Sequence, residues 1–107
     1  MSEFAEILAR LALVIEDRRG ADPSASYTAK LLADPVLAAK KLGEEAIETV
    51  IAATQGRGDA LAAESADLIY HWLVVLAAAD VSLDDVADRL KAREGVSGLD
   101  EKAGRSA

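Results

Sequence analysis

One segment restricts the possible folds of this chain more than any other. Residues 59–79 are apolar on almost every side of a helix, yet Glu64, Asp67 and His71 form one narrow ionisable stripe along it. A helix that is apolar all round is normally buried. A buried carboxylate must be paired or bound to a cation, because desolvating a bare charge costs roughly several kcal/mol. We therefore predict a core helix with a charged site along one side. Its apolar residues are Leu68, Ile69, Trp72, Leu73, Val74, Val75 and Leu76.

A second predicted helix, residues 35–54, places its charges on one face. At about 100° per residue, Lys41, Glu44, Glu45 and Glu48 share that face. Like charges at this spacing repel each other and weaken a helix. Taken alone, this pattern fits a solvated acidic face as well as it fits a binding site.

The acidic residues of the two helices combine into a more specific pattern. Glu45-x-x-Glu48 is followed by Glu64-x-x-Asp67, and residues 55–58 form a short break between them. Two antiparallel helices joined in this way would bring the pairs opposite each other. Oxygen ligands suit Mg²⁺, or else Mn²⁺, rather than Zn²⁺ or Cu²⁺. The predicted metal ligands are Glu44, Glu45, Glu48, Glu64 and Asp67.

The ring side chains near the second acid pair have simpler interpretations. His71 lies one helical turn beyond Asp67, and we expect it to be buried and hydrogen-bonded to a neighbouring carboxylate. Direct contact with metal or substrate is the alternative. Tyr70 and Trp72 are predicted to pack in the core rather than to stack on a nucleotide base.

A second candidate site precedes the acidic helices. Residues 26–30 contain three hydroxyl groups and one ammonium group near a predicted helix start, where phosphate oxygens can be held. From this segment alone, an ordinary helix cap with a solvated lysine is the favoured interpretation. The two lysines beside the acidic face either bind phosphates or offset the repulsion there. The candidate phosphate ligands are Ser26, Tyr27, Thr28, Lys30, Lys40 and Lys41.

The capping residues divide the chain into helices and predict an all-α fold. Ser2 caps the first helix, Asp34-Pro35 opens the third, Asp59 caps the fourth, and Ser82 with Asp85 resembles a capping box. No segment alternates with the period of a strand. We predict one helical domain over residues 1–94 and a loose tail over 95–107. The predicted helices span about residues 2–19, 26–33, 35–54, 59–79 and 82–93.

Composition excludes several classes of function. The net charge of −7 disfavours binding to nucleic acid or to an anionic membrane surface. The chain has no cysteine, which rules out a thiolate zinc site. Its longest apolar run, Trp72–Ala79, is too short to span a bilayer. We expect a cytoplasmic protein with neither nucleic-acid nor membrane partners, which can bind a phosphorylated small molecule if a metal supplies positive charge.

Three segments resemble phosphoribosyl-ATP pyrophosphohydrolases. They are Ser26–Leu32 (SYTAKLL), Lys40–Ala53 (KKLGEEAIETVIAA) and Glu64–Leu73 (ESADLIYHWL), and the resemblance extends over about residues 4–93. The acidic pattern is similar to that of the wider MazG-like superfamily, whereas the Ser26–Lys30 segment narrows the choice to this family.

The resemblance implies the second step of histidine biosynthesis, in which phosphoribosyl-ATP and water give phosphoribosyl-AMP and pyrophosphate. It also implies an all-α, MazG-like helical bundle completed by dimerisation, so that we expect a homo-oligomer of at least two chains. On this hypothesis a Mg²⁺-activated water attacks between the α and β phosphates. The residues expected to carry this chemistry are Glu45, Glu48, Glu64 and Asp67.

Two other functions stay open at this point. A MazG-like house-cleaning enzyme would share the metal site and hydrolyse free or damaged nucleoside triphosphates. A non-catalytic helical dimerisation module would leave the acids as a solvated face, and Mg²⁺ would not change its stability.

Overall fold

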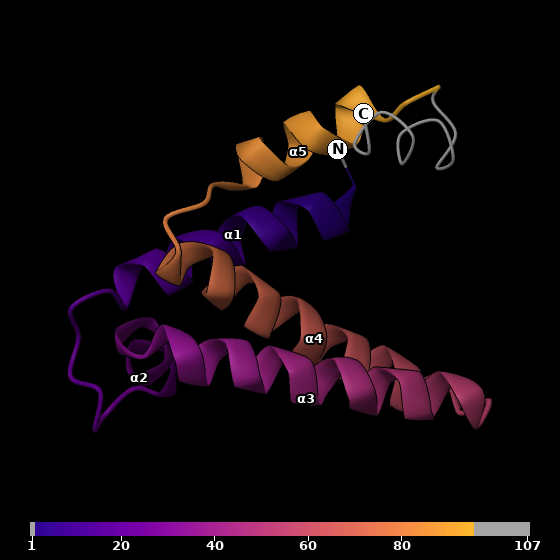
Figure 1. The fold of residues 1–107 in the computed structure, drawn as a ribbon, viewed down its shortest axis with the longest axis horizontal. Helices are drawn as coiled ribbons and strands as arrows, with labels where there is room; N and C mark the ends of the chain where they lie inside the picture. The colour runs from indigo at the N-terminus through magenta and orange to yellow at the C-terminus, as the bar shows by residue number, and fades with distance from the viewer. Residues whose placement is uncertain (1, 96–107) are drawn as a thin grey trace, which may run out of the picture.

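The computed structural model describes residues 2–95, and the regular secondary structure in this part of the chain is all α-helix (Figure 1). This confirms the all-α prediction. Residues 96–107, most of the predicted loose tail, lie outside the described residues. The helices are α1 (Glu3–Asp17), α2 (Tyr27–Ala33), α3 (Pro35–Thr54), α4 (Gly58–Ala78) and α5 (Leu83–Ala92).

Most of the predicted helix starts are confirmed by their caps. The Ser2 side chain accepts a hydrogen bond from the backbone N–H of Ala5, and Asp34 accepts one from Leu37 at 3.1 Å. Ser82 opens α5 with a complete capping box. Short polar side chains at these positions satisfy N–H groups that have no partner within the helix.

The predicted cap of α4 is wrong. The helix begins at Gly58, with Arg57 at the N-cap position and no side-chain cap, so that Asp59 lies inside the first turn. The chain reverses through Gly56, whose φ of 67° favours glycine. Helical geometry therefore resumes one residue before Asp59, whose charge suits the positive end of the helix dipole instead.

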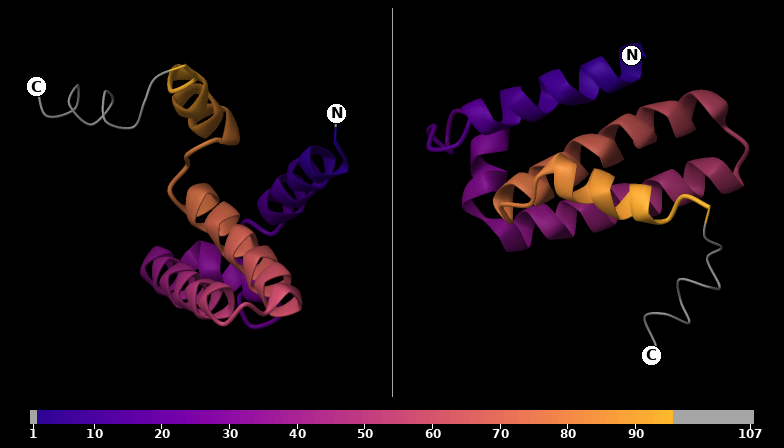
Figure 2. Two further views of the ribbon diagram at one scale, coloured as in Figure 1. Left: turned by 90° about the vertical axis from the view of Figure 1, so that its right-hand side faces the viewer. Right: turned by 90° about the horizontal axis from the view of Figure 1, so that it is seen from above.

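Helices α3 and α4 form an antiparallel hairpin that carries both acid pairs (Figure 1). Thr49 links the two helices, because its hydroxyl oxygen lies 2.7 Å from the Glu45 carbonyl oxygen and 3.3 Å from that of Glu64. Helices α1 and α2 also pack on α4, whereas α5 lies beyond its far end (Figure 2). The hairpin is therefore the element that positions the predicted site.

The core of a single chain is small, and α4 is its central helix, with α1, α2 and α3 packed against it. Its fully buried centre contains Ile15, Leu31 and Val74. Of the residues in the most apolar stretch of α4, only 17% are fully buried. Each residue in the range 68–78 is at least partly buried, so that the predicted all-round burial is reached only in part within one chain.

In the described part of the chain, the large exposed apolar side chains lie outside α4. Helix α4 is long and apolar enough to cross a membrane by length and composition alone, a test that core helices of bundles also pass. Helices α1 and α3 carry large exposed apolar side chains. They are Phe4, Ile7, Leu13 and Val14 in α1 and Val36, Ile47, Val50 and Ile51 in α3.

Candidate metal centre

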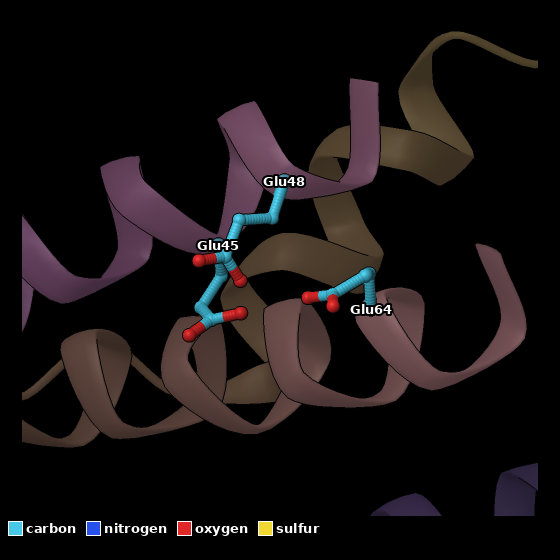
Figure 3. Close-up of side chains that lie close together, drawn as sticks. All are labelled: Glu45, Glu48 and Glu64. Atoms are coloured by element: carbon cyan, nitrogen blue, oxygen red, sulfur yellow. The ribbon is translucent and has the colours of Figure 1, made fainter. Parts of the chain in front are cut away.

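Three of the predicted metal ligands converge between α3 and α4 (Figure 3). Glu45 and Glu48 project from α3 and Glu64 from α4, and one carboxylate oxygen of each lies within 4.8 Å of the others. The i, i+3 spacing in α3 puts its two acids on one face, and the antiparallel packing sets Glu64 opposite them. The predicted convergence of the two helices is therefore present in the fold.

The cluster contains carboxylate oxygens that have no partner. Among the described residues, no hydrogen-bond donor reaches the buried Oε2 atoms of Glu45 and Glu64. An unpaired buried acceptor is costly, and more so when it is charged. A site built only from carboxylate oxygens fits Mg²⁺ or Mn²⁺, either of which would satisfy these atoms.

Two members of the cluster, Glu64 and Glu45, have raised pKa values. The pKa of Glu64 rises to about 6, mainly because a protonated Glu64 can hydrogen-bond to the Glu48 carboxyl group, with burial and the charges of Glu48 and Glu45 adding to the effect. Burial is the largest cause of the raised pKa of Glu45, followed by the neighbouring Glu48. Both shifts show that the ionised cluster lacks enough positive charge.

The other two predicted ligands lie outside this close group. Asp67 is exposed, although its negative charge contributes to the raised pKa of Glu45. It lies about 4.5 Å farther along the α4 axis than Glu64, as three helical residues require. Glu44 is turned about 100° from Glu45 around α3, and its carboxylate lies 3.3 Å from the Lys41 ammonium nitrogen.

The predicted phosphate-binding hydroxyls are all engaged within the protein. Ser26 caps α2, accepting a hydrogen bond from the Ala29 N–H at 3.1 Å. The hydroxyl groups of Thr28 and Tyr70 hydrogen-bond to each other, and the Tyr27 hydroxyl lies 3.0 Å from Nε2 of His71. These bonds fix the first turn of α2 against α4.

The lysines of the predicted phosphate site differ in their surroundings. Lys30 is exposed and lines an open hollow together with Ser26 and Tyr27. Lys40 is also exposed. Lys41 is half-buried, and its charge and that of Glu45 both act on the Tyr27 hydroxyl. The fold thus connects the Ser26–Lys30 segment electrostatically with the acidic face of α3.

His71 is buried, as predicted, but its partners are not carboxylates. Nδ1 lies 2.7 Å from the Asp67 backbone carbonyl oxygen, and Nε2 faces Tyr27. The prediction of a carboxylate partner is wrong, because the i, i+4 spacing brings the ring over the carbonyl group of its own helix. Tyr70 and Trp72 lie against the core, which confirms their packing role.

Two residues near the cluster, Thr49 and Arg57, are not among the predicted site residues. Thr49 ties together the helix backbones that carry Glu45 and Glu64. Arg57 lines a cavity of ≈ 160 Å³ together with Glu48 and Glu64. The sequence could have indicated Arg57, because it lies in the short break between the two acidic helices. A loop that joins antiparallel helices lies near the facing sides of both.

Comparisons with known proteins agree with this geometry. The model of the family described as phosphoribosyl-ATP pyrophosphohydrolase matches residues 8–94. A phosphoribosyl-ATP pyrophosphatase of Caulobacter sp. (strain K31) is 70% identical over 98% of each chain. Those of Caulobacter vibrioides (strain NA1000 / CB15N) and Parvibaculum lavamentivorans are 68% and 58% identical, and the alignments cover at least 96% of each chain.

The raised pKa of Glu64 predicts how stability depends on pH. Without metal, the protonated form is favoured in the fold. This contribution is therefore fully present below pH 4.5 and is lost as pH rises through about 6. We expect Glu64→Gln to raise the metal-free melting temperature relative to wild type at pH 7.5, and to do so less at pH 4.5. Adding Mg²⁺ at pH 7.5 should stabilise wild type far more than the variant.

Thermal melts with and without Mg²⁺ measure both effects. Asp88→Asn in α5 is the matched control, since it removes one exposed negative charge away from the cluster. Equal responses of the Glu64 and Asp88 variants would contradict a metal site and favour a solvated acidic face.

Proposed function

The chain belongs to the phosphoribosyl-ATP pyrophosphohydrolase family, and we propose that it hydrolyses phosphoribosyl-ATP to phosphoribosyl-AMP and pyrophosphate. This reaction is the second step of histidine biosynthesis. The observation that carries the proposal is the convergence of Glu45, Glu48 and Glu64 within the part of the chain that matches the family. An acidic pocket with unpaired oxygens suits a metal-dependent attack on a triphosphate chain better than a purely structural role does.

We propose that Mg²⁺, or alternatively Mn²⁺, binds between α3 and α4. Glu45, Glu48 and Glu64 would hold it directly, with Asp67 and Glu44 at the edges of the site. When bound, the metal would neutralise phosphate charge and lower the pKa of a coordinated water. The orphaned Oε2 atoms of Glu45 and Glu64 support this assignment, because they are buried without any donor in the described part of the chain.

Side chains in and around the cluster would provide proton transfer and phosphate binding. A carboxylate of the cluster would accept a proton from the water that attacks one of the two phosphorus atoms joined by the α–β bridging oxygen. The bridging P–O bond to that phosphorus would break, so that pyrophosphate separates from phosphoribosyl-AMP. Lys41, close to the acids, and the exposed Lys30 and Lys40 would bind phosphate oxygens. Arg57 joins these candidates, because it shares a cavity with Glu48 and its guanidinium group suits phosphate.

We further propose that two or more copies of the chain assemble. Several large apolar residues are more than half exposed, for example Phe4 at 58% and Val50 at 61%. A large apolar surface of this kind is costly to leave in water. A second copy would cover them and would complete the burial of the partly buried residues of α4. We also propose a cytoplasmic location and a nucleotide substrate, in keeping with the proposed reaction. The negative net charge fits the proposal that neither nucleic acid nor a membrane is a partner.

The reaction and its metal dependence are tested by measuring pyrophosphate release from phosphoribosyl-ATP. We expect turnover with Mg²⁺, loss of turnover on chelation, and a far lower kcat/KM for a panel of nucleoside and deoxynucleoside triphosphates. Glu48→Gln should lower kcat/KM by roughly 100-fold or more, since it removes a metal ligand at the reacting centre.

Circular dichroism should show unchanged helicity in the Glu48 variant, and Asp88→Asn serves as the charge-matched control. Wild-type activity in Glu48→Gln would refute its role. Preference for a deoxynucleoside triphosphate over phosphoribosyl-ATP would instead favour the house-cleaning activity.

The assembly is tested by sedimentation equilibrium. We expect a mass of at least twice the 11.2 kDa of one chain, because burial of the exposed apolar faces favours association. A mass of one chain at all concentrations would disprove the homo-oligomer.

A further inference from the structure

His71 is a buried polar side chain that the proposed reaction does not use. Only 7% of the residue is exposed, and both ring nitrogens have partners. Nδ1 lies 2.7 Å from the carbonyl oxygen of Asp67, and Nε2 lies 3.0 Å from the hydroxyl oxygen of Tyr27. The ring thus connects a residue at the edge of the metal centre to the first turn of α2.

The direction of these hydrogen bonds follows from their partners. A backbone carbonyl can only accept, so that Nδ1 must carry a proton and donate to Asp67. With the ring proton on Nδ1, the imidazole presents the lone pair of Nε2, and the Tyr27 hydroxyl donates to it. Partial burial raises the pKa of Tyr27 above its ordinary value, with the Lys41 ammonium opposing this effect, so that the hydroxyl keeps its proton at neutral pH.

The Tyr27 side chain is held in one orientation. Its ring stacks on Tyr70, with centroids 6.4 Å apart, and meets the edge of His71 at 5.9 Å. Its hydroxyl oxygen lies against α4, 3.0 Å from Nε2 of His71, and the charges of Lys41, Glu45 and Glu44 act on the hydroxyl group. The Tyr27 residue as a whole is 48% exposed and therefore lies at the protein surface.

We propose that His71 is a positioning residue that holds the Tyr27 hydroxyl as a hydrogen-bond acceptor, so that Tyr27 recognises a sugar hydroxyl of the substrate rather than a phosphate oxygen. An ionised phosphate oxygen only accepts hydrogen bonds, and the single proton of Tyr27 is committed to His71. A ribose hydroxyl can donate to the free lone pairs of the tyrosine oxygen. The phosphates are then left to the lysines. This inference rests on the proposed function, and it replaces the prediction that Tyr27 is a phosphate ligand.

Two substitutions of His71 separate its two hydrogen bonds. In His71→Gln the side-chain amide reaches the position of Nε2, where its oxygen can accept from Tyr27. In His71→Asn the shorter amide can replace Nδ1 and donate to Asp67, but it cannot reach Tyr27. We expect His71→Asn and Tyr27→Phe each to raise KM for phosphoribosyl-ATP by about 3- to 10-fold. A change of this size corresponds to the loss of one hydrogen bond between neutral groups. His71→Gln should stay within about 2-fold of wild type.

A double variant and a sugar-free ligand complete the test. Tyr27→Phe combined with His71→Asn should raise KM no more than Tyr27→Phe alone, because both act through one hydroxyl group. Inorganic tripolyphosphate, which has no sugar, should inhibit wild type and Tyr27→Phe with the same inhibition constant. Weaker inhibition of Tyr27→Phe by tripolyphosphate would overturn the proposal and restore Tyr27 as a phosphate ligand.

Tyr70→Phe provides the structural control. It removes the hydrogen bond to Thr28 and loosens α2 without touching the Tyr27 hydroxyl. If Tyr70→Phe raises KM as much as Tyr27→Phe does, or if His71→Gln fails to preserve KM, the positioning role is refuted. Absence of phosphoribosyl-ATP turnover in the wild-type protein would instead refute the proposed function on which the inference rests.

Discussion

The close approach of three carboxylates between α3 and α4 is the constraint on which the rest of this structure depends. Glu45, Glu48 and Glu64 are brought together by apolar packing and by the Thr49 link, not by attraction between themselves. The raised pKa values and the unpaired buried oxygens of Glu45 and Glu64 show that the hairpin holds these two groups at an energetic cost. A cost of this kind at one place is what the proposed cation site would relieve.

A second set of contacts sets the distance between this centre and α2. The Tyr27–His71 and Thr28–Tyr70 hydrogen bonds join the first turn of α2 to the middle of α4, just beyond Asp67. The two regions that resemble family signatures are therefore parts of one surface. Because the hydroxyl groups of α2 already have partners within the protein, we assign phosphate binding to the lysines and propose the Tyr27 hydroxyl as a hydrogen-bond acceptor for the sugar.

Burial of the apolar helix α4 is a demanding requirement for a domain of this size. In a single chain only 17% of the residues in the most apolar stretch of this helix are fully buried, and α1 and α3 expose large apolar side chains. A domain of this size buries a limited share of its surface. An assembly of copies would complete the core and would remove water from the neighbourhood of the acids, where electrostatic interactions then become stronger.

The sequence alone determined the helices and the facing of the two acid pairs, because caps, the helical period and the short Gln55–Gly58 break are local features. It also identified the family through Ser26–Lys30 and the acidic segments. Only the tertiary structure decided that Asp67 and Glu44 stand apart from the close group, that His71 bonds to a carbonyl and to Tyr27, and that Arg57 lines the site. These outcomes depend on the rotation and crossing of packed helices, which side-chain spacing within one helix does not encode.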